Sequence, residues 1–139
     1  MKIFYSPLSP YVRKCMVVAL ELGLTDRIEK INGAANPITR DPAIVAKNPL
    51  GKVPTFIAED GTALYDSRVI CEYLNELGKG TLIPASGSAR WQVMTEQSLG
   101  DGILTPRCWL DTKPSCARKP CAGPNGLRGK WKRFTQAWR

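Results

Sequence analysis

The sequence predicts an α/β fold in which helices flank a mixed four-stranded sheet, and three observations support that prediction. A short apolar strand is followed by a capped amphipathic helix and a second strand, which predicts a right-handed parallel crossover. Two short strand-like runs then flank a polar turn, which is typical of a hairpin. A last amphipathic helix closes the unit, so the expected order of elements is β-α-β-α-β-β-α.

The first strand is expected from Lys2 to Tyr5, ahead of a helix whose start is marked by two residues. Ser9 stands at the N-cap, and Pro10 takes the first helical position, where its missing N–H is not needed. Five apolar residues then recur at the spacing of one helical stripe: Val12, Cys15, Met16, Ala19 and Leu20. Gly23 ends this helix.

The middle of the unit follows from similar local signals. We expect a second strand from Arg27 to Ile31, and a short helix that begins at Asp41-Pro42 and reaches Lys47. The hairpin strands are expected over residues 55–58 and 63–65. The turn between them reads Glu59-Asp60-Gly61-Thr62.

Asp66 is the expected cap of the last helix, and Gly78 its end. The apolar stripe of this helix is Ile70, Tyr73, Leu74 and Leu77. A mixed sheet built in this order is the thioredoxin-like arrangement, which we assign to residues 1–80. Residues 81–104 then read as a linker followed by another helix, over 88–104.

Three motifs stand where predicted elements begin or end. They are Ser6-Pro7-Leu8-Ser9-Pro10-Tyr11-Val12-Arg13-Lys14, then Asn48-Pro49-Leu50-Gly51-Lys52-Val53-Pro54-Thr55, then Asp66-Ser67. Each also has an ordinary structural explanation. Ser9 and Asp66 serve as helix caps, and an exposed Lys52 is simply solvated.

In this order along the chain, the three motifs resemble those of the glutathione S-transferase family, in its bacterial type, and the resemblance covers residues 1–104. It implies a glutathione-binding thioredoxin-like domain followed by an all-helical domain, of which residues 81–104 would be the linker and first helix. The implied reaction is attack of the glutathione thiolate on an electrophilic carbon, which forms a thioether. Glutathione is then the co-substrate, a small electrophile the second partner, and a homodimer the usual assembly of the family.

The resemblance implies that a hydroxyl or thiol in the first turn stabilises the glutathione thiolate. Ser9 holds that place, with Ser6 as the second choice. A helix N-terminus there would assist by its dipole. Because a helix cap and a thiolate donor use the same location, both roles of Ser9 stay open.

The other two motifs are implied to hold the glutathione peptide. Val53-Pro54 corresponds to a cis-proline that exposes the backbone N–H and C=O of Val53 to the cysteinyl backbone. Lys52 suits the glycine carboxylate. Asp66 and Ser67 suit the γ-glutamyl amine and carboxylate, the latter at a helix N-terminus. Cys15 and Cys71 are expected to be buried packing residues.

Residues 105–139 have a different composition from the rest of the chain. They carry nine Lys and Arg and a single acid, and so account for the whole net charge of +8. Three of the four Trp and three of the five Cys also lie there. Pro106, Pro114, Pro120 and Pro124 stand too close together for long helices. We therefore expect an irregular basic tail and a truncated second domain, and as a consequence weak or absent turnover and impaired dimerisation.

Two explanations of this tail stay open. A change of reading frame is favoured, because the composition breaks abruptly inside a predicted helix. If each codon of the tail is shifted one base earlier, it takes the last base of the codon before it. The codons of Cys108 and Trp109 then necessarily encode a leucine, and synonymous choices elsewhere allow a shifted tail that is amphipathic and free of cysteine. The alternative is a non-catalytic remnant whose basic arm binds nucleic acid or anionic surfaces, with residues 128–134 contacting phosphates and stacking on bases.

Several function classes are excluded or disfavoured by composition. No apolar run approaches the roughly 20 residues of a membrane span. The N-terminus lacks signal-peptide features, which predicts a cytoplasmic protein. Five cysteines without a CxxC pair, and no histidine, argue against a disulfide framework and a transition-metal site.

Overall fold

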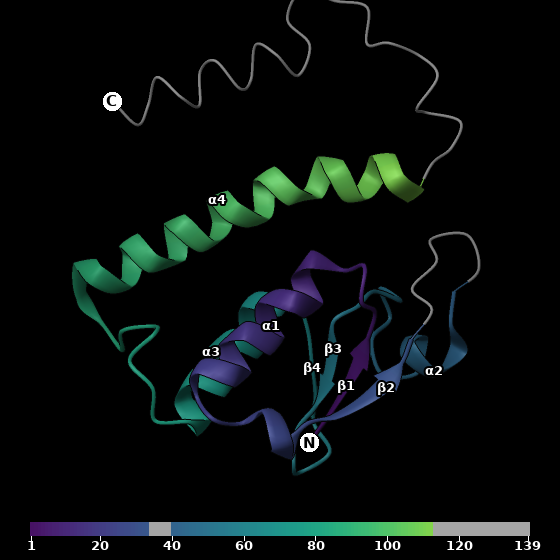
Figure 1. The fold of residues 1–139 in the computed structure, drawn as a ribbon, viewed down its shortest axis with the longest axis horizontal. Coiled ribbons are helices and arrows are strands. Elements are labelled where there is room, and N and C mark those ends of the chain that lie inside the picture. The colour runs from purple at the N-terminus through teal and green to yellow at the C-terminus, as the bar shows by residue number, and fades with distance from the viewer. Residues whose placement is uncertain (34–39, 113–139) are drawn as a thin grey trace, which may run out of the picture. The chain divides into compact units, whose positions relative to one another are not determined.

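A computed structural model describes residues 1–33 and 40–112, and the rest of the predicted tail lies outside these ranges. Four strands form one sheet in the order β2-β1-β3-β4. They are β1 (Lys2–Tyr5), β2 (Glu29–Asn32), β3 (Thr55–Ile57) and β4 (Ala63–Leu64). The first two are parallel, and both other pairings are antiparallel. The predicted mixed sheet is therefore confirmed (Figure 1).

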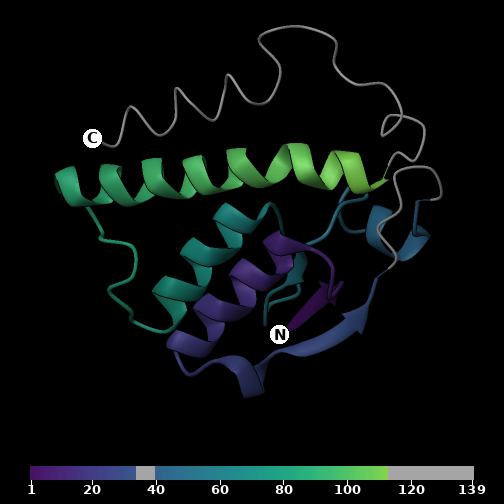
Figure 2. The same cartoon turned by 45° about the horizontal axis from the view of Figure 1, so that its top comes forward.

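Helices α1 (Pro10–Glu21) and α3 (Ser67–Leu77) lie side by side on one face of the sheet in both ribbon views (Figures 1 and 2). Ser9 and Asp66 cap these helices as expected, and Gly23, with φ of 66°, follows the end of α1. Their inward side chains form the main core together with the sheet. Its fully buried members include Ile3, Val12, Cys15, Phe56, Ile70 and Leu74.

The other face of the sheet is covered in part by α2 (Pro42–Val45), which Asp41 caps. Phe4 follows Ile3 in β1 and so points to the opposite face from the main core. Its side chain lies near the buried Ile44 of α2, with Gly33 between the two. A Cβ at Gly33 would lie 3.0 Å from Cδ1 of Ile44, so the Ile44 side chain would have to shift by a few tenths of an ångström to make room for a larger residue.

Three local predictions were wrong. The short helix expected to reach Lys47 ends at Val45, with Ala46 as its C-cap. The strand expected to begin at Arg27 begins at Glu29, because Thr25–Arg27 form a 3₁₀ turn, η1, before it. Leu20, expected on the buried stripe of α1, is 66% exposed. The stripe narrows to Val12, Cys15 and Ala19 because α3 and the sheet cover only that side of the helix.

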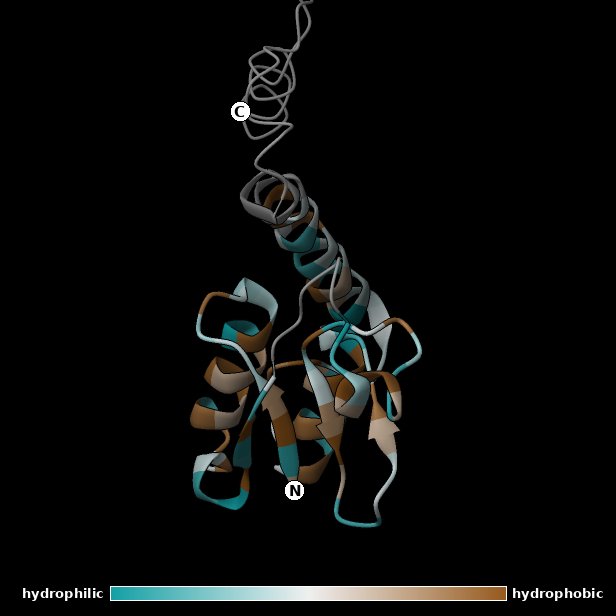
Figure 3. Cartoon of the chain, turned by 90° about the vertical axis from the view of Figure 1, so that its right-hand side faces the viewer, coloured by the Kyte–Doolittle hydropathy of each residue, from teal (hydrophilic) through white to brown (hydrophobic). Residues whose placement is uncertain are grey.

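The helix expected over 88–104 is present as α4 (Gly87–Thr112) and continues past Leu104. The residue at which the composition changes is thus not the end of the helix. Figure 3 shows α4 as a mixture of hydrophilic and hydrophobic residues along its length. In the part of the chain that the structure describes, no helix combines the length and apolarity needed to cross a membrane.

Candidate functional site

The sheet topology brings the three sequence motifs to one end of the sheet, where β1 and β4 end and β3 begins. Phe4, near the end of β1, pairs with Thr55, the first residue of β3, so the turn after β1 and the segment before β3 meet there. Leu64 at the end of β4 pairs with Phe56, which adds the start of α3 to the same edge. The structure therefore places all the predicted site residues, from Ser6 to Ser67, around one end of the sheet.

Ser9 lies at the start of α1, half-buried, and its side chain closes the helix. Its Oγ accepts a hydrogen bond of 3.3 Å from the backbone N–H of Val12. The hydroxyl hydrogen is left to donate elsewhere, so capping and donation to a ligand are compatible. Ser6 is half-buried just after β1, and its carbonyl accepts the N–H of Ser9.

The segment before β3 is held by Asn48, which is 1% exposed. Its Nδ2 donates to the Lys52 carbonyl at 3.2 Å and to Thr55 Oγ1 at 2.9 Å, while its Oδ1 accepts from Leu50 N–H at 3.0 Å. Thr55 in turn donates to the Lys52 carbonyl at 2.8 Å. Asn48 stands in the predicted motif, but its role as the organiser of this loop was missed, because sequence alone does not show which amide is buried.

The Val53-Pro54 bond is cis, as predicted. Within the described ranges, no hydrogen bond uses the N–H or C=O of Val53. The backbone ahead of β3 thus presents a free donor and a free acceptor, the arrangement with which a peptide adds to a strand. Lys52, next to it, is exposed.

Asp66 and Ser67 lie at the start of α3 and differ in exposure. The Asp66 carboxylate, 53% exposed, accepts from the Arg68 N–H at 2.9 Å and pairs with the Arg68 guanidinium at 2.8 Å. The hydrogen bonds from the Arg68 side chain hold the pKa of Asp66 below its usual range, so the carboxylate is ionised at neutral pH. Ser67 is 2% exposed, and no group in the described part of the chain accepts a hydrogen bond from its N–H, as expected in a first helical turn.

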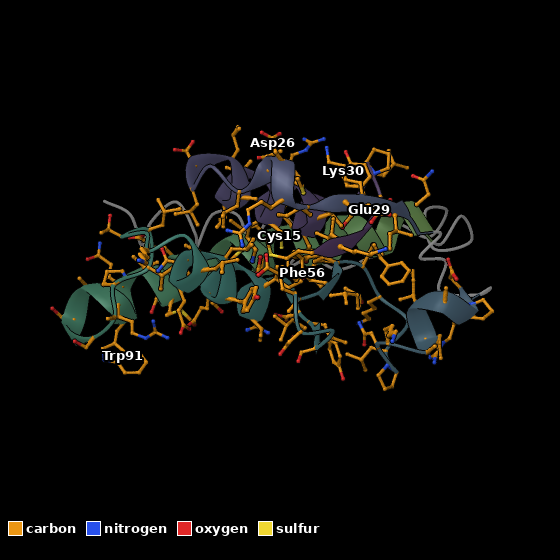
Figure 4. The ribbon with its side chains drawn as sticks, turned by 90° about the horizontal axis from the view of Figure 1, so that it is seen from below. Cys15, Asp26, Glu29, Lys30, Phe56 and Trp91 are labelled. Atoms are coloured by element: carbon orange, nitrogen blue, oxygen red, sulfur yellow. The ribbon has the colours of Figure 1, made fainter. Side chains whose placement is uncertain are left out.

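Cys15 and Cys71 face each other between α1 and α3, and both are buried as predicted. The Sγ of Cys15 lies 3.8 Å from the Ser67 carbonyl, which joins α1 to the first turn of α3. The hydrogen bond with Cys71, and burial, raise the pKa of the Cys15 thiol. Figure 4 shows Cys15 and Phe56 in the interior, whereas Trp91 of α4 points outward. Cys15 is therefore a packing residue between the two halves of the site.

Two side chains early in α1 contact α4, and sequence reasoning missed them. Lys14 Nζ lies 2.8 and 2.9 Å from the two carboxylate oxygens of Asp101. The Tyr11 hydroxyl donates to the Asp101 carbonyl at 3.1 Å and lies 2.7 Å from Thr105 Oγ1. Sequence separations of about ninety residues carry no local signal, so only the fold shows these contacts.

Comparison with known proteins agrees with this arrangement. The fold and the cis-proline edge define a thioredoxin-like domain followed by the beginning of a helical region. Residues 8–77 match the family described as "Glutathione S-transferase, N-terminal domain". The chain belongs to the glutathione S-transferase family.

Relatives and solved structures point the same way. The chain is 35% identical over 105 residues to an uncharacterized GST-like protein of Escherichia coli, YibF, which covers 75% of this chain and 50% of YibF. A glutathione transferase family member from Pseudomonas fluorescens, with bound glutathione, superposes with a TM-score of 0.78 at 35% identity, covering 98% of this chain and 64% of that one. A glutathione S-transferase from Methylobacillus flagellatus, also with glutathione bound, superposes with a TM-score of 0.73 at 31% identity. The match covers 97% of this chain and 65% of that one. The chain thus spans between half and two thirds of the length of these proteins.

Proposed function

We propose that this chain binds glutathione at the edge of the sheet where its three motifs meet. The observation that carries the proposal is the convergence of Ser9, the free backbone of Val53 and the Asp66-Ser67 helix start at that one edge. The two solved relatives described above contain glutathione, which supports the same ligand here.

Each part of glutathione has a matching group. The cysteinyl N–H and C=O pair with the free C=O and N–H of Val53, as an added strand would. The γ-glutamyl carboxylate meets the unpaired N–H of Ser67 at the start of α3, where the helix dipole favours an anion. The ionised Asp66 attracts the γ-glutamyl ammonium, and the exposed Lys52 attracts the glycine carboxylate.

The sulfur of glutathione is then expected next to Ser9. A free thiol has a pKa of about 8.5, so most of it is protonated at neutral pH. A hydrogen bond from the Ser9 hydroxyl, together with the N-terminus of α1, favours the thiolate and lowers that pKa. Ser6 is the second candidate donor, since it lies in the same turn.

We also propose the chemistry of the family for this site, namely conjugation. The thiolate attacks an electrophilic carbon, a carbon–sulfur bond forms, and the leaving group departs with the bonding electron pair. The enzyme contributes by lowering the thiol pKa and by orienting the two reactants. Conjugation is therefore proposed for the site alone, because the chain spans only part of its relatives' length.

Glutathione binding is tested with a pair of matched aspartates. Asp66 and Asp60 each accept a hydrogen bond of 2.9 Å from the N–H two residues on, but Asp60 lies in the β3–β4 turn. By calorimetric titration, Asp66→Asn is expected to weaken glutathione about tenfold, while Asp60→Asn leaves the affinity unchanged. Equal effects of the two variants, or no binding by the wild-type chain, would contradict the proposal.

The role of Ser9 is tested separately from its role as a cap. Ser9→Ala is expected to cost about 1 kcal/mol of stability through the lost cap, and also to raise the pKa of bound glutathione toward about 8.5. Asp41→Ala serves as the control, because it removes the cap of α2. The Oδ1 of Asp41 accepts a hydrogen bond of 2.9 Å from the N–H of Ala43. Thiolate absorbance against pH should shift for the first variant alone; an unshifted titration would leave Ser9 only a cap.

For residues 105–139 we propose an out-of-frame reading of a helical second domain. The support is the abrupt change of composition at Leu104, within the continuous helix α4. The coding DNA around Leu104 tests it: a frame that resumes one base away supports the proposal. An intact frame, with salt-sensitive DNA binding that is lost on deletion of 105–139, would favour the basic arm instead.

A further inference from the structure

Helix α4 is joined to the thioredoxin-like unit at two polar contacts. Near its start, Arg90 pairs with Glu72 of α3 at 2.6 Å. Further along, Asp101 receives Lys14 and Tyr11 of α1. Between these contacts only Val93 and Met94, both half-buried, pack against the core.

The Asp101 contact is well enclosed for an ion pair on a helix surface. The side chains of Lys14 and Asp101 are 25% and 19% exposed, and both carboxylate oxygens are engaged. The Asp101 carbonyl also accepts hydrogen bonds from Tyr11 and Thr105. Reduced exposure to water makes such a contact stronger than an ordinary surface pair.

The helix is intrinsically weak where this contact is made. Asp101 stands between Gly100 and Gly102, and a Cβ at either glycine would meet nothing within 4 Å. Packing therefore does not require these glycines, although glycine lowers helix stability relative to alanine. The position of this turn consequently depends on its contacts with α1 rather than on the stiffness of α4.

The same contacts lie beside the proposed sulfur position. Tyr11 and Lys14 follow Ser9 by two and five residues on α1, so the 101–105 turn of α4 is held close to the beginning of that helix. Leu8, in the turn before Ser9, is 90% exposed. It offers apolar surface that a hydrophobic group on the sulfur can cover.

We propose that Asp101 is a positioning residue. Held by Lys14 and Tyr11, it fixes the 101–105 turn of α4 as a wall beside the glutathione sulfur and thereby favours ligands with an apolar substituent on that sulfur. The inference rests on the proposed function, since it takes the sulfur to lie at Ser9.

The test compares glutathione with S-hexylglutathione, using the full-length chain. Asp101→Asn keeps the shape of the side chain but removes its charge. We expect it to weaken S-hexylglutathione about tenfold and glutathione less than about twofold, since glutathione itself is held at the edge of the sheet. Hydrogen exchange of the amides of residues 101–105 should become about tenfold faster, with α3 unchanged.

Two controls separate this role from a general loss of charge or stability. Glu59→Gln removes the exposed pair with Arg27, at 2.6 Å, and should change neither affinity. Lys14→Asp alone should remove the preference for S-hexylglutathione. The double variant Lys14→Asp with Asp101→Lys, which exchanges the two charges, should restore part of that preference.

Each outcome decides one proposal. Equal weakening of both ligands by Asp101→Asn, or no weakening, would overturn the positioning role while leaving glutathione binding in place. A wild-type chain that bound neither ligand would overturn the proposed function, and with it the part of Asp101 in ligand choice. Unchanged exchange at residues 101–105 would show that the contact does not hold α4.

Discussion

The α1–α3 face of the sheet and helix α4 are held in place by different kinds of interaction. Between α1, α3 and the sheet, the large side chains are buried completely, as Phe56, Ile70 and Leu74 show. Along α4 the apolar contacts are partial, Trp91 is 68% exposed, and two ion pairs join the helix to α1 and α3. The first region is stabilised by area removed from water, the second by a few charged groups.

This difference assigns separate tasks to the two regions. Close-packed interiors tolerate little rearrangement, so the α1–α3 face suits a site that needs groups at fixed positions. A helix held by a few polar contacts can be displaced at lower cost, so α4 suits the variable part of a binding site. Four predictions test this contrast, from the largest expected effect to the smallest.

The largest effect is expected at Phe56. It is fully buried, and its ring lies 5.8 Å from that of Tyr73. Phe56→Ala should lower the free energy of unfolding by about 3–5 kcal/mol, because it removes buried apolar surface and leaves a cavity. Met94→Ala, on α4, should cost at most about 1.5 kcal/mol, since Met94 is only half-buried. Urea denaturation measures both, and equal losses would mean that α4 shares the core.

The next effect is expected at the loop that carries Val53. Asn48→Ala leaves the Leu50 N–H without its partner and removes both donations of the amide, so it should cost about 2–3 kcal/mol. Asn75 is the matched control: its amide bonds the N–H and C=O of Ile83, in the linker before α4, at 3.2 and 3.0 Å. Asn75→Ala should cost about 1 kcal/mol. A larger loss at Asn75 in thermal unfolding would reverse the contrast.

Sequence patterns predicted most of the thioredoxin-like unit, because its signals are local. A serine or aspartate cap followed by an apolar stripe marks a helix within a dozen residues, and Ser9 and Asp66 both did so. The hairpin was equally local, with its turn between two short strands. The start of β2 was missed because propensity does not separate a 3₁₀ turn from the strand after it.

The site was predicted only where a residue acts through its own neighbours. Val53-Pro54 and Asp66-Ser67 are each a pair of adjacent residues. Asn48 required knowledge of burial, and Lys14 and Asp101 required knowledge of how α4 meets α1. Exposed Leu20 was placed in the core for the same reason, since periodicity shows a stripe but not how much of it a neighbour covers.

The third prediction concerns the glycines of α4. Gly100→Ala and Gly102→Ala should each stabilise this helix by about 1 kcal/mol, since neither added Cβ meets a neighbouring atom. Slower hydrogen exchange at residues 100–105 measures the gain. Gly33→Ala is the opposite control, because its Cβ would press on Ile44 at 3.0 Å and destabilise the sheet unit. Faster exchange in the α4 variants would mean that the structure of α4 requires glycine at these two positions.

The smallest effect is expected from an ion pair within the sheet unit, Asp66–Arg68, whose side chains are 53% and 50% exposed. Arg68 lowers the pKa of Asp66 below the ordinary 3.8. The stabilising effect of the ion pair is therefore fully present above pH 3.8, and it is lost as the pH falls through the lower pKa that Asp66 has in the folded state. Water screens a half-exposed pair. The free energy of unfolding of the wild-type chain should therefore exceed that of Arg68→Met by less than about 1 kcal/mol at pH 6.

Urea unfolding at pH 6 and at successively lower pH measures this difference, which should shrink to zero below the folded-state pKa. A difference that grew as the pH fell would contradict the assignment of the pair. The more enclosed Lys14–Asp101 pair, at 25% and 19% exposure, should give a larger difference at pH 6 when Lys14 is changed to Met. If the two pairs had equal effects, burial would not be what makes the charges on α4 matter, and the contrast between the two regions would rest on apolar packing alone.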